Sequence, residues 1–274
     1  MQIGYVCTNF NNSALTIQAL NTLLLQTPHE IRLVVVDNDS QPADRERLQR
    51  FAATNPSVEV IVSPKNVGYF AGLNIGIRHL RTTEPVIDYI VIGNNDLLFP
   101  RGFVDAVERN LESFKTNAVI SPNIVTLNGE HQNPHVIRRL SPAREFAYDL
   151  YHWNYHLAQA LVWLARLTKR FTDRDDERHH DKPGYIWQGH GSCYLLGPLF
   201  FQHFTELWAP AFMLGEEFFL SQQLEEIGMK IYYEPSIVVK HHLHATLGAI
   251  PGVKKWEYSR EAHQIYRKYV GIFG

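Results

Sequence analysis

Residues 31–40 read IRLVVVDNDS, a run of apolar side chains that stops at a cluster of polar ones. An apolar run without alternation is typical of a strand buried on both faces, as in a parallel sheet covered by helices. The polar cluster begins where this strand should end, and parallel α/β sheets place their ligands beyond that end. This stretch therefore predicts an α/β domain with a binding site along one edge of its sheet.

The sequence on either side alternates between strand-like and helix-like segments. Around the strand at 31–36, further strands are predicted at residues 3–8, 58–62 and 89–92, and helices at 13–26, 45–54 and 71–80. Asn11, Asn12 and Ser13 are the candidate caps of the first helix. Strands separated by helices form βαβ units, so we predict a doubly wound, mainly parallel sheet with helices on both faces.

Charge and cysteine content exclude several classes of protein. The 274 residues include 26 Lys and Arg against 28 Asp and Glu, so no global positive field indicates a nucleic-acid partner. Cys7 and Cys193 both lie in apolar runs, which favours a reducing, cytoplasmic location. No leader-like segment opens the sequence, and the apolar stretch at 157–167 is too short to cross ~30 Å of hydrocarbon. We expect a cytoplasmic protein that does not span a membrane.

Three polar turns follow predicted strands, at residues 37–40, 64–68 and 93–96. Each alone is typical of an ordinary turn, but together they fall along one edge of the sheet. Asn94, Asn95 and Asp96 offer the oxygen ligands that Mg²⁺ or Mn²⁺ prefer, completed by substrate phosphates. Because neither a P-loop nor a dinucleotide fingerprint is present, we predict a metal-centred site for a nucleoside diphosphate.

Two segments of the second half carry further candidates. Glu216 and Glu217 are adjacent within an apolar stretch, and apolar surroundings raise the pKa of a carboxyl and make it a better base. The first turn of a helix explains the same acids equally well. His190, Gly191 and Ser192 precede an apolar strand, where small residues let an acceptor approach or form a bulge.

Residues 131–183 differ in composition and are predicted to form a helical insert. One predicted helix there carries an apolar stripe. This stripe could pack against the protein's own core, against a second copy in a homodimer, or against the anionic inner face of a membrane. It consists of Leu150, Trp153, Leu157, Leu161 and Leu164. Residues 172–181 read TDRDDERHHD, which predicts a solvated connection.

These motifs together resemble the family 2 glycosyltransferases of the GT-A fold, especially bacterial rhamnosyltransferase-like members. The segment Asn9-Phe10-Asn11-Asn12 is similar to the family's segment after the first strand, and residues 34–40 to its base- and ribose-binding run. Asn66-x-Gly68 and Asn74-x-Gly76 are similar to its diphosphate segment. The resemblance implies nucleotide contacts from Asn9, Asn11, Asp37, Asp39, Asn66, Gly68, Asn74 and Asn95.

The resemblance also implies a metal site and a base. Asn94-Asn95-Asp96 stands in the place of the family's Asp-x-Asp, so Asp96 should supply the carboxylate for Mg²⁺ or Mn²⁺. Pro235 followed by His241 fits the closing Pro…His pattern, whose histidine approaches the metal or the diphosphate. Glu216-Glu217 stands where the family has Glu-Asp, and the second acid is usually the base, which implicates Glu217.

The implied activity is inverting transfer of a sugar from a UDP- or dTDP-linked donor to a hydroxyl of a glycan or lipid-linked glycan, in bacterial polysaccharide synthesis. Residues 1–130 would bind the nucleotide sugar, and residues 184–274 would complete the same domain with the acceptor site. A sugar-nucleotide pyrophosphorylase is an alternative, but it would carry a glycine-rich basic loop where this chain has residues 8–12. A non-catalytic carbohydrate-binding protein of the same fold is the other alternative.

Overall fold

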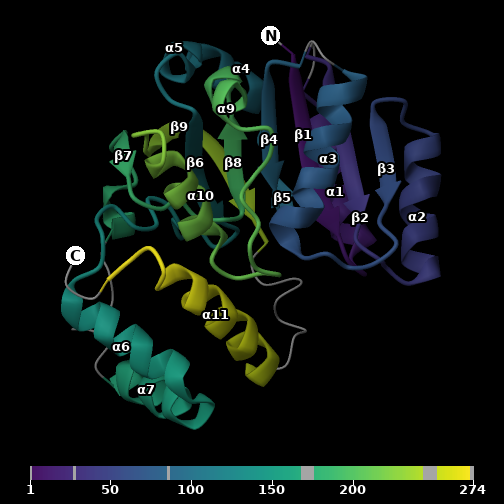
Figure 1. Ribbon diagram of the computed structural model, residues 1–274. Helices are drawn as coiled ribbons and strands as arrows, with labels where there is room; N and C mark the ends of the chain where they lie inside the picture. Colours follow the sequence, from purple (N-terminus) through teal and green to yellow (C-terminus); the bar gives the residue numbers. More distant parts are fainter. Residues whose placement is uncertain (1, 27–28, 85–86, 168–175, 243–251, 272–274) are drawn as a thin grey trace.

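The computed structural model describes residues 2–26, 29–84, 87–167, 176–242 and 252–271, and its described strands form one large sheet (Figure 1). The strand order is β3-β2-β1-β4-β8-β6-β9-β5, and β7 pairs with β9. The strands are β1 Ile3–Asn9, β2 Ile31–Asp37, β3 Val58–Val62, β4 Tyr89–Gly93, β5 Leu97–Leu98, β6 Val119–Thr126, β7 Gly184–Ile186, β8 Cys193–Leu196 and β9 Ile231–His241.

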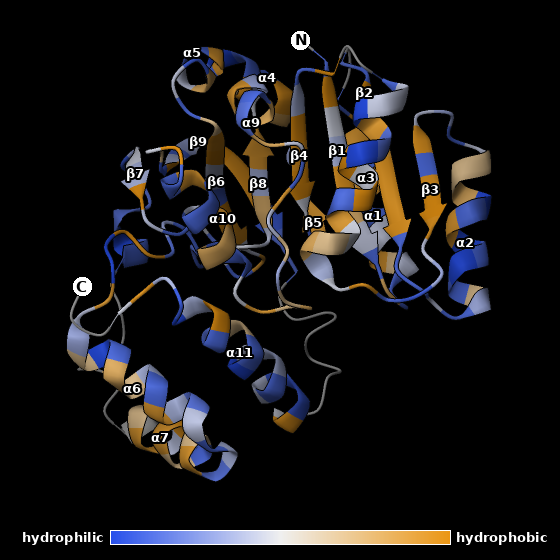
Figure 2. Ribbon diagram, in the orientation of Figure 1, coloured by the Kyte–Doolittle hydropathy of each residue, from blue (hydrophilic) through white to orange (hydrophobic). Residues whose placement is uncertain are grey.

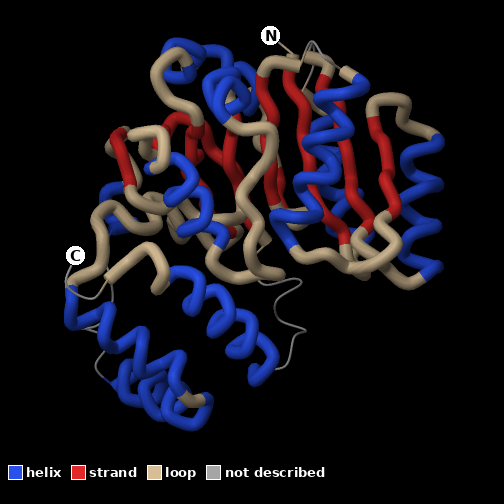
Figure 3. Tube along the Cα trace, in the orientation of Figure 1, coloured by secondary structure: helices blue, strands red, loops and turns tan. Residues whose placement is uncertain are grey.

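Helices cover both faces of the sheet (Figure 3). Buried side chains of α1, α2 and α4 contact one face, and those of α3, α9 and α10 contact the other. The helices are α1 Ser13–Leu24, α2 Pro42–Ala53, α3 Tyr69–Thr83, α4 Phe103–Arg109, α5 Leu111–Phe114, α6 Pro142–Trp153, α7 Tyr155–Leu167, α9 Pro198–His203, α10 Glu216–Glu225 and α11 Gly252–Tyr266, with a short 3₁₀ turn at Asp176–His179.

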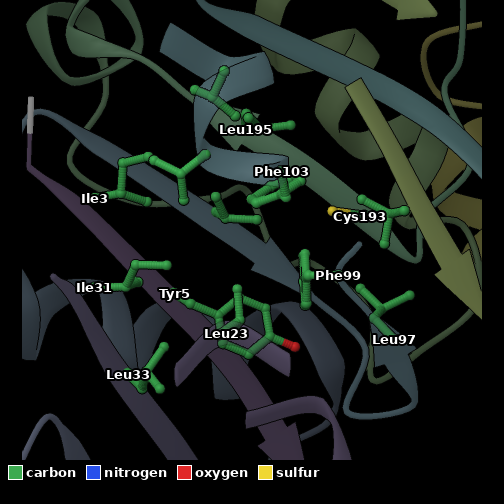
Figure 4. Close-up of a cluster of buried hydrophobic side chains, with 14 of the residues drawn as sticks. Ile3, Tyr5, Leu23, Ile31, Leu33, Leu97, Phe99, Phe103, Cys193 and Leu195 are labelled. Carbon is green, nitrogen blue, oxygen red and sulfur yellow. The ribbon is translucent and has the colours of Figure 1, made fainter. Parts of the chain in front are cut away.

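The central strands are buried on both faces, as their apolar sequences predict (Figure 2). In β1, Tyr5 and Cys7 enter the first core while Val6 between them enters the second, since successive side chains of a strand point to opposite faces. Figure 4 shows the first core, where Tyr5 meets Phe99 edge-on at 5.3 Å between ring centroids. These two cores hold the strand ends in fixed positions.

The predicted α/β architecture is confirmed, with element ends within three residues of the predicted ones in the first half. Strands β3, β2, β1 and β4 are parallel, as expected. The second half makes the sheet mixed, because β8 runs antiparallel to both β4 and β6, and β5 antiparallel to β9. Strands as short as β5 and β7 carry no periodicity that a sequence pattern can detect.

One of the predicted caps of the first helix, Asn12, is confirmed in position but not in its capping hydrogen bond. Instead, Asp44 of α2 accepts the Ser13 N–H at 3.0 Å and the Ser13 hydroxyl at 2.6 Å. A carboxylate from a neighbouring helix therefore stabilises the start of α1, which local sequence cannot indicate.

In the described part of the insert, α6 and α7 are separate helices, so the prediction of one continuous helical stripe is wrong. The chain is extended at Asn154, whose Oδ1 accepts the N–H groups of His156 and Leu157 and begins α7. Helix α6 packs on α11, where Trp256 Nε1 donates to Tyr151 O at 2.9 Å. Trp153 is left 71% exposed. In the predicted connection, residues 172–175 lie outside the described residues.

Among the described helices, none combines the length and the apolar character needed to cross a bilayer.

Candidate functional site

The three predicted polar turns meet at one edge of the sheet, beyond the carboxyl ends of β1 to β4. The side chain of Asn38 joins two of them, because its Nδ2 donates to Gly68 O at 2.9 Å and its Oδ1 accepts the Val67 N–H at 3.0 Å. Across the neighbouring strands, Asn9 Nδ2 donates to Asp37 Oδ1 at 3.2 Å. The expected common rim is therefore present.

Asn9 lies beneath this rim and has no surface left for a ligand. It is fully buried, and its Nδ2 lies within 3.2 Å of oxygens on Asp37, Ser40 and Asp44. Its Oδ1 accepts the hydroxyl of Thr16 at 2.8 Å. Instead of contacting a nucleotide, as the motif implied, Asn9 ties together the segments that form the rim.

The Asp37–Ser40 turn presents charged side chains in two layers. Asp37 is completely buried and accepts from Arg45 Nε at 2.9 Å. Asp39 is half exposed in a left-handed conformation, with φ of 68°, and its Oδ1 lies 3.8 Å from the same guanidinium. Asn11, exposed beside this turn, accepts the Gln41 N–H at 2.7 Å. Asp39, Asn11 and Arg45 therefore face outward, and Asp37 orients Arg45, which no sequence motif had singled out.

The residues of the predicted diphosphate segment also differ in position, because some lie at the rim and one points away from it. Gly68 has φ of 90°, and a Cβ there would lie 1.9 Å from Phe212 O, so only glycine fits. Asn66 Oδ1 accepts the Gly68 N–H at 3.0 Å and holds this turn at the rim. Asn74 points elsewhere, since both ends of its amide bond the main chain of Leu207 at 2.8 and 2.9 Å. Asn74 braces a loop and is not placed for nucleotide contact.

A cavity of about 660 Å³ lies beside α3, lined among others by Val67, Asn74, Arg78 and Trp208. Its charged lining residues Arg78 and Glu206 form an ion pair. The size of this cavity does not make it the reactive site, because none of the candidate metal ligands or bases described below is among the residues that line it.

Asp96 and His241 converge at the rim. Pairing of β5 with β9 sets Leu97 opposite His241 and brings Asp96 Oδ1 to 3.3 Å from His241 Nε2. This oxygen is buried and, among the described residues, has no hydrogen-bond partner. Two adjacent ligands of an octahedral cation with ~2.1 Å bonds lie about 3.0 Å apart. The pair therefore fits two ligands of one divalent cation, with further positions left for phosphate oxygens and water.

The other two residues of the predicted metal motif, Asn94 and Asn95, contact neighbouring side chains of the rim. Asn95 is 5% exposed and donates to Thr16 Oγ1 at 2.8 Å, which joins it to the network under the rim. Asn94 Nδ2 lies 3.5 Å from His241 Nε2. Of the three, Asp96 is the one with a side-chain charge, and its buried Oδ1 has no hydrogen-bond partner in the described part of the chain, so Asp96 stays the candidate carboxylate ligand.

A second group of metal-type side chains lies at the opposite edge of the sheet. His29, Asp105 and Glu108 bring their ligand atoms within 4.8 Å of one another, and His29 Nε2 lies 2.8 Å from Asp105. His29 precedes β2, so this group is at the amino ends of the parallel strands. It is partly exposed and forms ordinary ion pairs, and it has no connection with the rim.

Glu216 and Glu217 begin α10 and take different environments. Glu216 is 8% exposed, and burial together with the adjacent Glu217 raises its pKa to about 8. Its Oε1 accepts the Leu214 N–H at 3.1 Å. The more exposed Glu217 turns toward the loop before β8, where its Oε1 accepts the Gly191 N–H at 3.1 Å. Near neutral pH Glu216 therefore holds a proton, and Glu217 is the carboxylate placed to accept one.

The His190–Ser192 loop connects this carboxylate with the metal-type pair. Ser192 O accepts the Asn94 N–H at 2.8 Å, so the loop lies directly against the segment that carries Asp96. A Cβ on Gly191 would lie 2.6 Å from Glu217 Oε1, so a larger residue here would displace this carboxylate. Tyr69, which sequence reasoning missed, donates to Gly191 O at 3.2 Å. The rim thus places a candidate cation-binding pair and a candidate base on either side of one short loop.

Comparison with known proteins identifies a family that matches the chain. The family model "Glycosyl transferase family 2" matches residues 6–186. No curated protein sequence matches the chain significantly.

Several solved structures share the fold at low sequence identity. The mannosyltransferase PcManGT from Pyrobaculum calidifontis, solved with GDP-Man and Mn²⁺, is 16% identical with a TM-score of 0.59, over 98% of this chain and 65% of that one. GalNAc-T7, solved with UDP, GalNAc and Mn²⁺, is 12% identical with a TM-score of 0.62, over 88% of this chain and 44% of that one.

TarS 1–349 from S. aureus is 10% identical with a TM-score of 0.56, over 98% of this chain and 72% of that one. The chain thus spans less than two thirds of the first two structures, and at these identities the likeness establishes the fold alone. Since the family model matches well over half of the residues, the chain belongs to glycosyl transferase family 2.

Proposed function

We propose that this protein is a metal-dependent, inverting glycosyltransferase that moves a sugar from a nucleoside diphosphate to an acceptor hydroxyl. The observation that carries the proposal is the buried Oδ1 of Asp96, which lies beside His241 Nε2 and, within the part of the chain that the structure describes, accepts no hydrogen bond. Burying a carboxylate oxygen without a partner is unfavourable unless a ligand completes its environment. The family placement and the Mn²⁺ in two of the similar structures support a divalent cation there.

The residues around this pair suggest how transfer proceeds. Asp96 and His241 would hold the cation, which would supply positive charge to stabilise the departing nucleoside diphosphate. Glu217, oriented by the Gly191 N–H, accepts the proton of the acceptor hydroxyl as its oxygen attacks the anomeric carbon. Attack from the face opposite the leaving group inverts the configuration at that carbon. Glu216 keeps its proton and so leaves Glu217 as the base.

For the donor and the acceptor, we propose classes of compound and the residues that would contact them. Asp39, Asn11 and Arg45 face outward at the rim and are our candidates for contacts with the base and ribose, while Gly68 lines the diphosphate position. UDP- and dTDP-linked sugars remain our first candidates, and a rhamnosyl donor and a role in bacterial polysaccharide synthesis rest on motif resemblance. The His190–Ser192 loop, beside Glu217, is where we place the acceptor, a glycan or lipid-linked glycan.

The exposed aromatic residues of the insert support peripheral contact with a membrane. Trp153 and Trp163 are 71% and 63% exposed, and tryptophan favours the membrane–water interface. Binding to anionic vesicles that disappears in the double variant Trp153→Ser/Trp163→Ser supports this contact. Vesicle binding that is unchanged in that variant, or absent from the wild type, contradicts it.

The enzyme hypothesis is tested by offering UDP-, dTDP- and GDP-linked sugars with Mn²⁺ and following release of nucleoside diphosphate with and without glycan acceptors. Release that increases with an acceptor, with an inverted anomeric proton signal in the product, supports transfer. Pyrophosphate-dependent cleavage of the donor would instead support a pyrophosphorylase. Binding of donor or glycan without any turnover would support a non-catalytic binding protein.

A further inference from the structure

A single amide joins the candidate metal site to the acceptor loop. Gln132 follows β6, and its Oε1 lies 2.8 Å from His241 Nδ1 while its Nε2 lies 3.4 Å from His190 Nε2. His190 extends this series of hydrogen-bonded groups, since its Nδ1 lies 2.9 Å from Ser192 Oγ. No motif in the sequence marks Gln132, and nothing in the proposed mechanism so far uses it.

The amide oxygen of Gln132 determines which nitrogen of His241 carries the hydrogen. A carbonyl oxygen only accepts hydrogen bonds, so Nδ1 must be the protonated nitrogen of the neutral ring. Nε2 then keeps its lone pair, and this is the nitrogen 3.3 Å from Asp96 Oδ1. Because Oδ1 receives no hydrogen bond, the two atoms are arranged as two ligands and not as donor and acceptor.

The opposite orientation of this amide would reverse the chain of hydrogen bonds. The NH₂ group would then donate to His241 Nδ1 and leave the hydrogen on Nε2, where it blocks a cation. The Ser192 N–H, 3.3 Å from His190 Nδ1, fits this reversed arrangement, since it needs an unprotonated Nδ1. Asn94 Nδ2, which can only donate and lies 3.5 Å from His241 Nε2, needs an unprotonated Nε2 and favours the first arrangement at the metal-facing ring. The orientation of one amide therefore separates a cation-accepting His241 from a cation-excluding one.

The neighbouring backbone holds Gln132 in place. Its N–H donates to Ile124 O of β6 at 2.8 Å. The next residue, Asn133, is fully buried, accepts the His190 N–H at 2.8 Å and donates to Pro122 O at 2.7 Å. Residues 132 and 133 thus fix the metal-facing histidine and the acceptor-loop histidine from one anchored segment.

We infer that Gln132 is a positioning residue, which holds His241 in the tautomer that binds the divalent cation and transmits that state to His190 in the acceptor loop. The inference rests on the proposed function, because it takes Asp96 and His241 as the cation ligands. Outer-shell partners of metal-binding histidines typically contribute 10–100-fold to affinity.

The test measures Mn²⁺ affinity directly, by electron paramagnetic resonance of free Mn²⁺, without any turnover. Gln132→Met keeps the length of the side chain but removes the acceptor, and we expect it to weaken binding about 10–100-fold. Gln132→Glu keeps an acceptor oxygen for His241 Nδ1–H and adds a negative charge, so it should bind Mn²⁺ at least as tightly as the wild type. Gln18→Met, an exposed site on α1, is the matched control and should change nothing. Nitrogen-15 spectra of the metal-free wild type should show His241 protonated at Nδ1.

Three results overturn the inference. The first applies when Mn²⁺ binding by the wild type depends on Asp96. If the Mn²⁺ affinity of Gln132→Met is then within about twofold of the wild-type affinity, Gln132 does not position the ligand. Equal losses in the Met and Glu variants, or His241 protonated at Nε2, have the same consequence. If the wild type binds no more tightly than Asp96→Ala, the proposed metal site itself fails together with this inference.

Discussion

Glu216→Gln should stabilise the protein, and the gain should grow as the pH rises. Burial and the adjacent Glu217 raise the pKa of Glu216 to about 8, against an ordinary value of 4.5. Between these values the folded state holds a proton that the unfolded chain has released, so the free energy of unfolding of the wild type falls as the pH rises from about 4.5 to about 8. Glutamine is neutral throughout and escapes this loss. The full difference corresponds to an upper value of about 5 kcal/mol above pH 8 and nearly nothing below pH 4.5.

Urea unfolding of both proteins at pH 5, 6, 7 and 8 measures this directly. Glutamine can still accept the Leu214 N–H through its Oε1, so the substitution keeps the local hydrogen bond. Glu226→Gln, exposed at the end of the same helix, is the matched control and should stay within about 0.5 kcal/mol of the wild type at every pH. A Glu216→Gln effect that is independent of pH would refute the assignment of the proton to Glu216.

The remaining predictions concern the rim. Glu217→Gln should lower turnover by about 10²–10⁴-fold and leave Mn²⁺ binding intact, whereas Glu216→Gln should lower turnover far less. Kinetics at saturating donor measure both effects, and the reversed order would exchange the two roles. Asp37→Ala should lower the free energy of unfolding by about 3 kcal/mol, because it leaves the partly buried Arg45 without its buried partner. Asp39→Ala, at a half-exposed position, should change that free energy by less than about 0.5 kcal/mol. Equal effects of the two substitutions in urea unfolding would contradict the two-layer arrangement. Gly68→Ala should destabilise much more than Gly129→Ala, since both have positive φ but only the former meets a backbone oxygen, at 1.9 Å; equal losses in thermal unfolding would exclude that clash.

Sequence patterns predicted the first half of the fold well for a physical reason. The strands from β1 to β4 are buried on both faces, so long apolar runs such as residues 31–36 mark them clearly. The second half depends on pairings between distant segments. β5 has two residues, yet its pairing with β9 is what carries Asp96 to His241. Neither its existence nor its partner leaves a local signal.

For the site, residue type and place after a strand predicted which segments meet but not which side chains are exposed. Asn9 and Asp37 belong to the quoted motifs, yet both are fully buried and serve as supports. Arg45 and Gln132 reach the rim through contacts with residues 8 and 109 positions away in sequence. Such roles follow from three-dimensional packing, and they emerge only once the strand ends are placed.

The central claim is that Asp96 and His241 hold a divalent cation which binds the donor's diphosphate. Calorimetric titration of UDP, dTDP and GDP into the wild type and Asp96→Ala, each with and without Mn²⁺, tests it most directly. We predict that at least one nucleotide binds the wild type in a Mn²⁺-dependent manner and that Asp96→Ala loses this dependence while remaining folded. Equal, Mn²⁺-stimulated binding to both proteins would contradict the account.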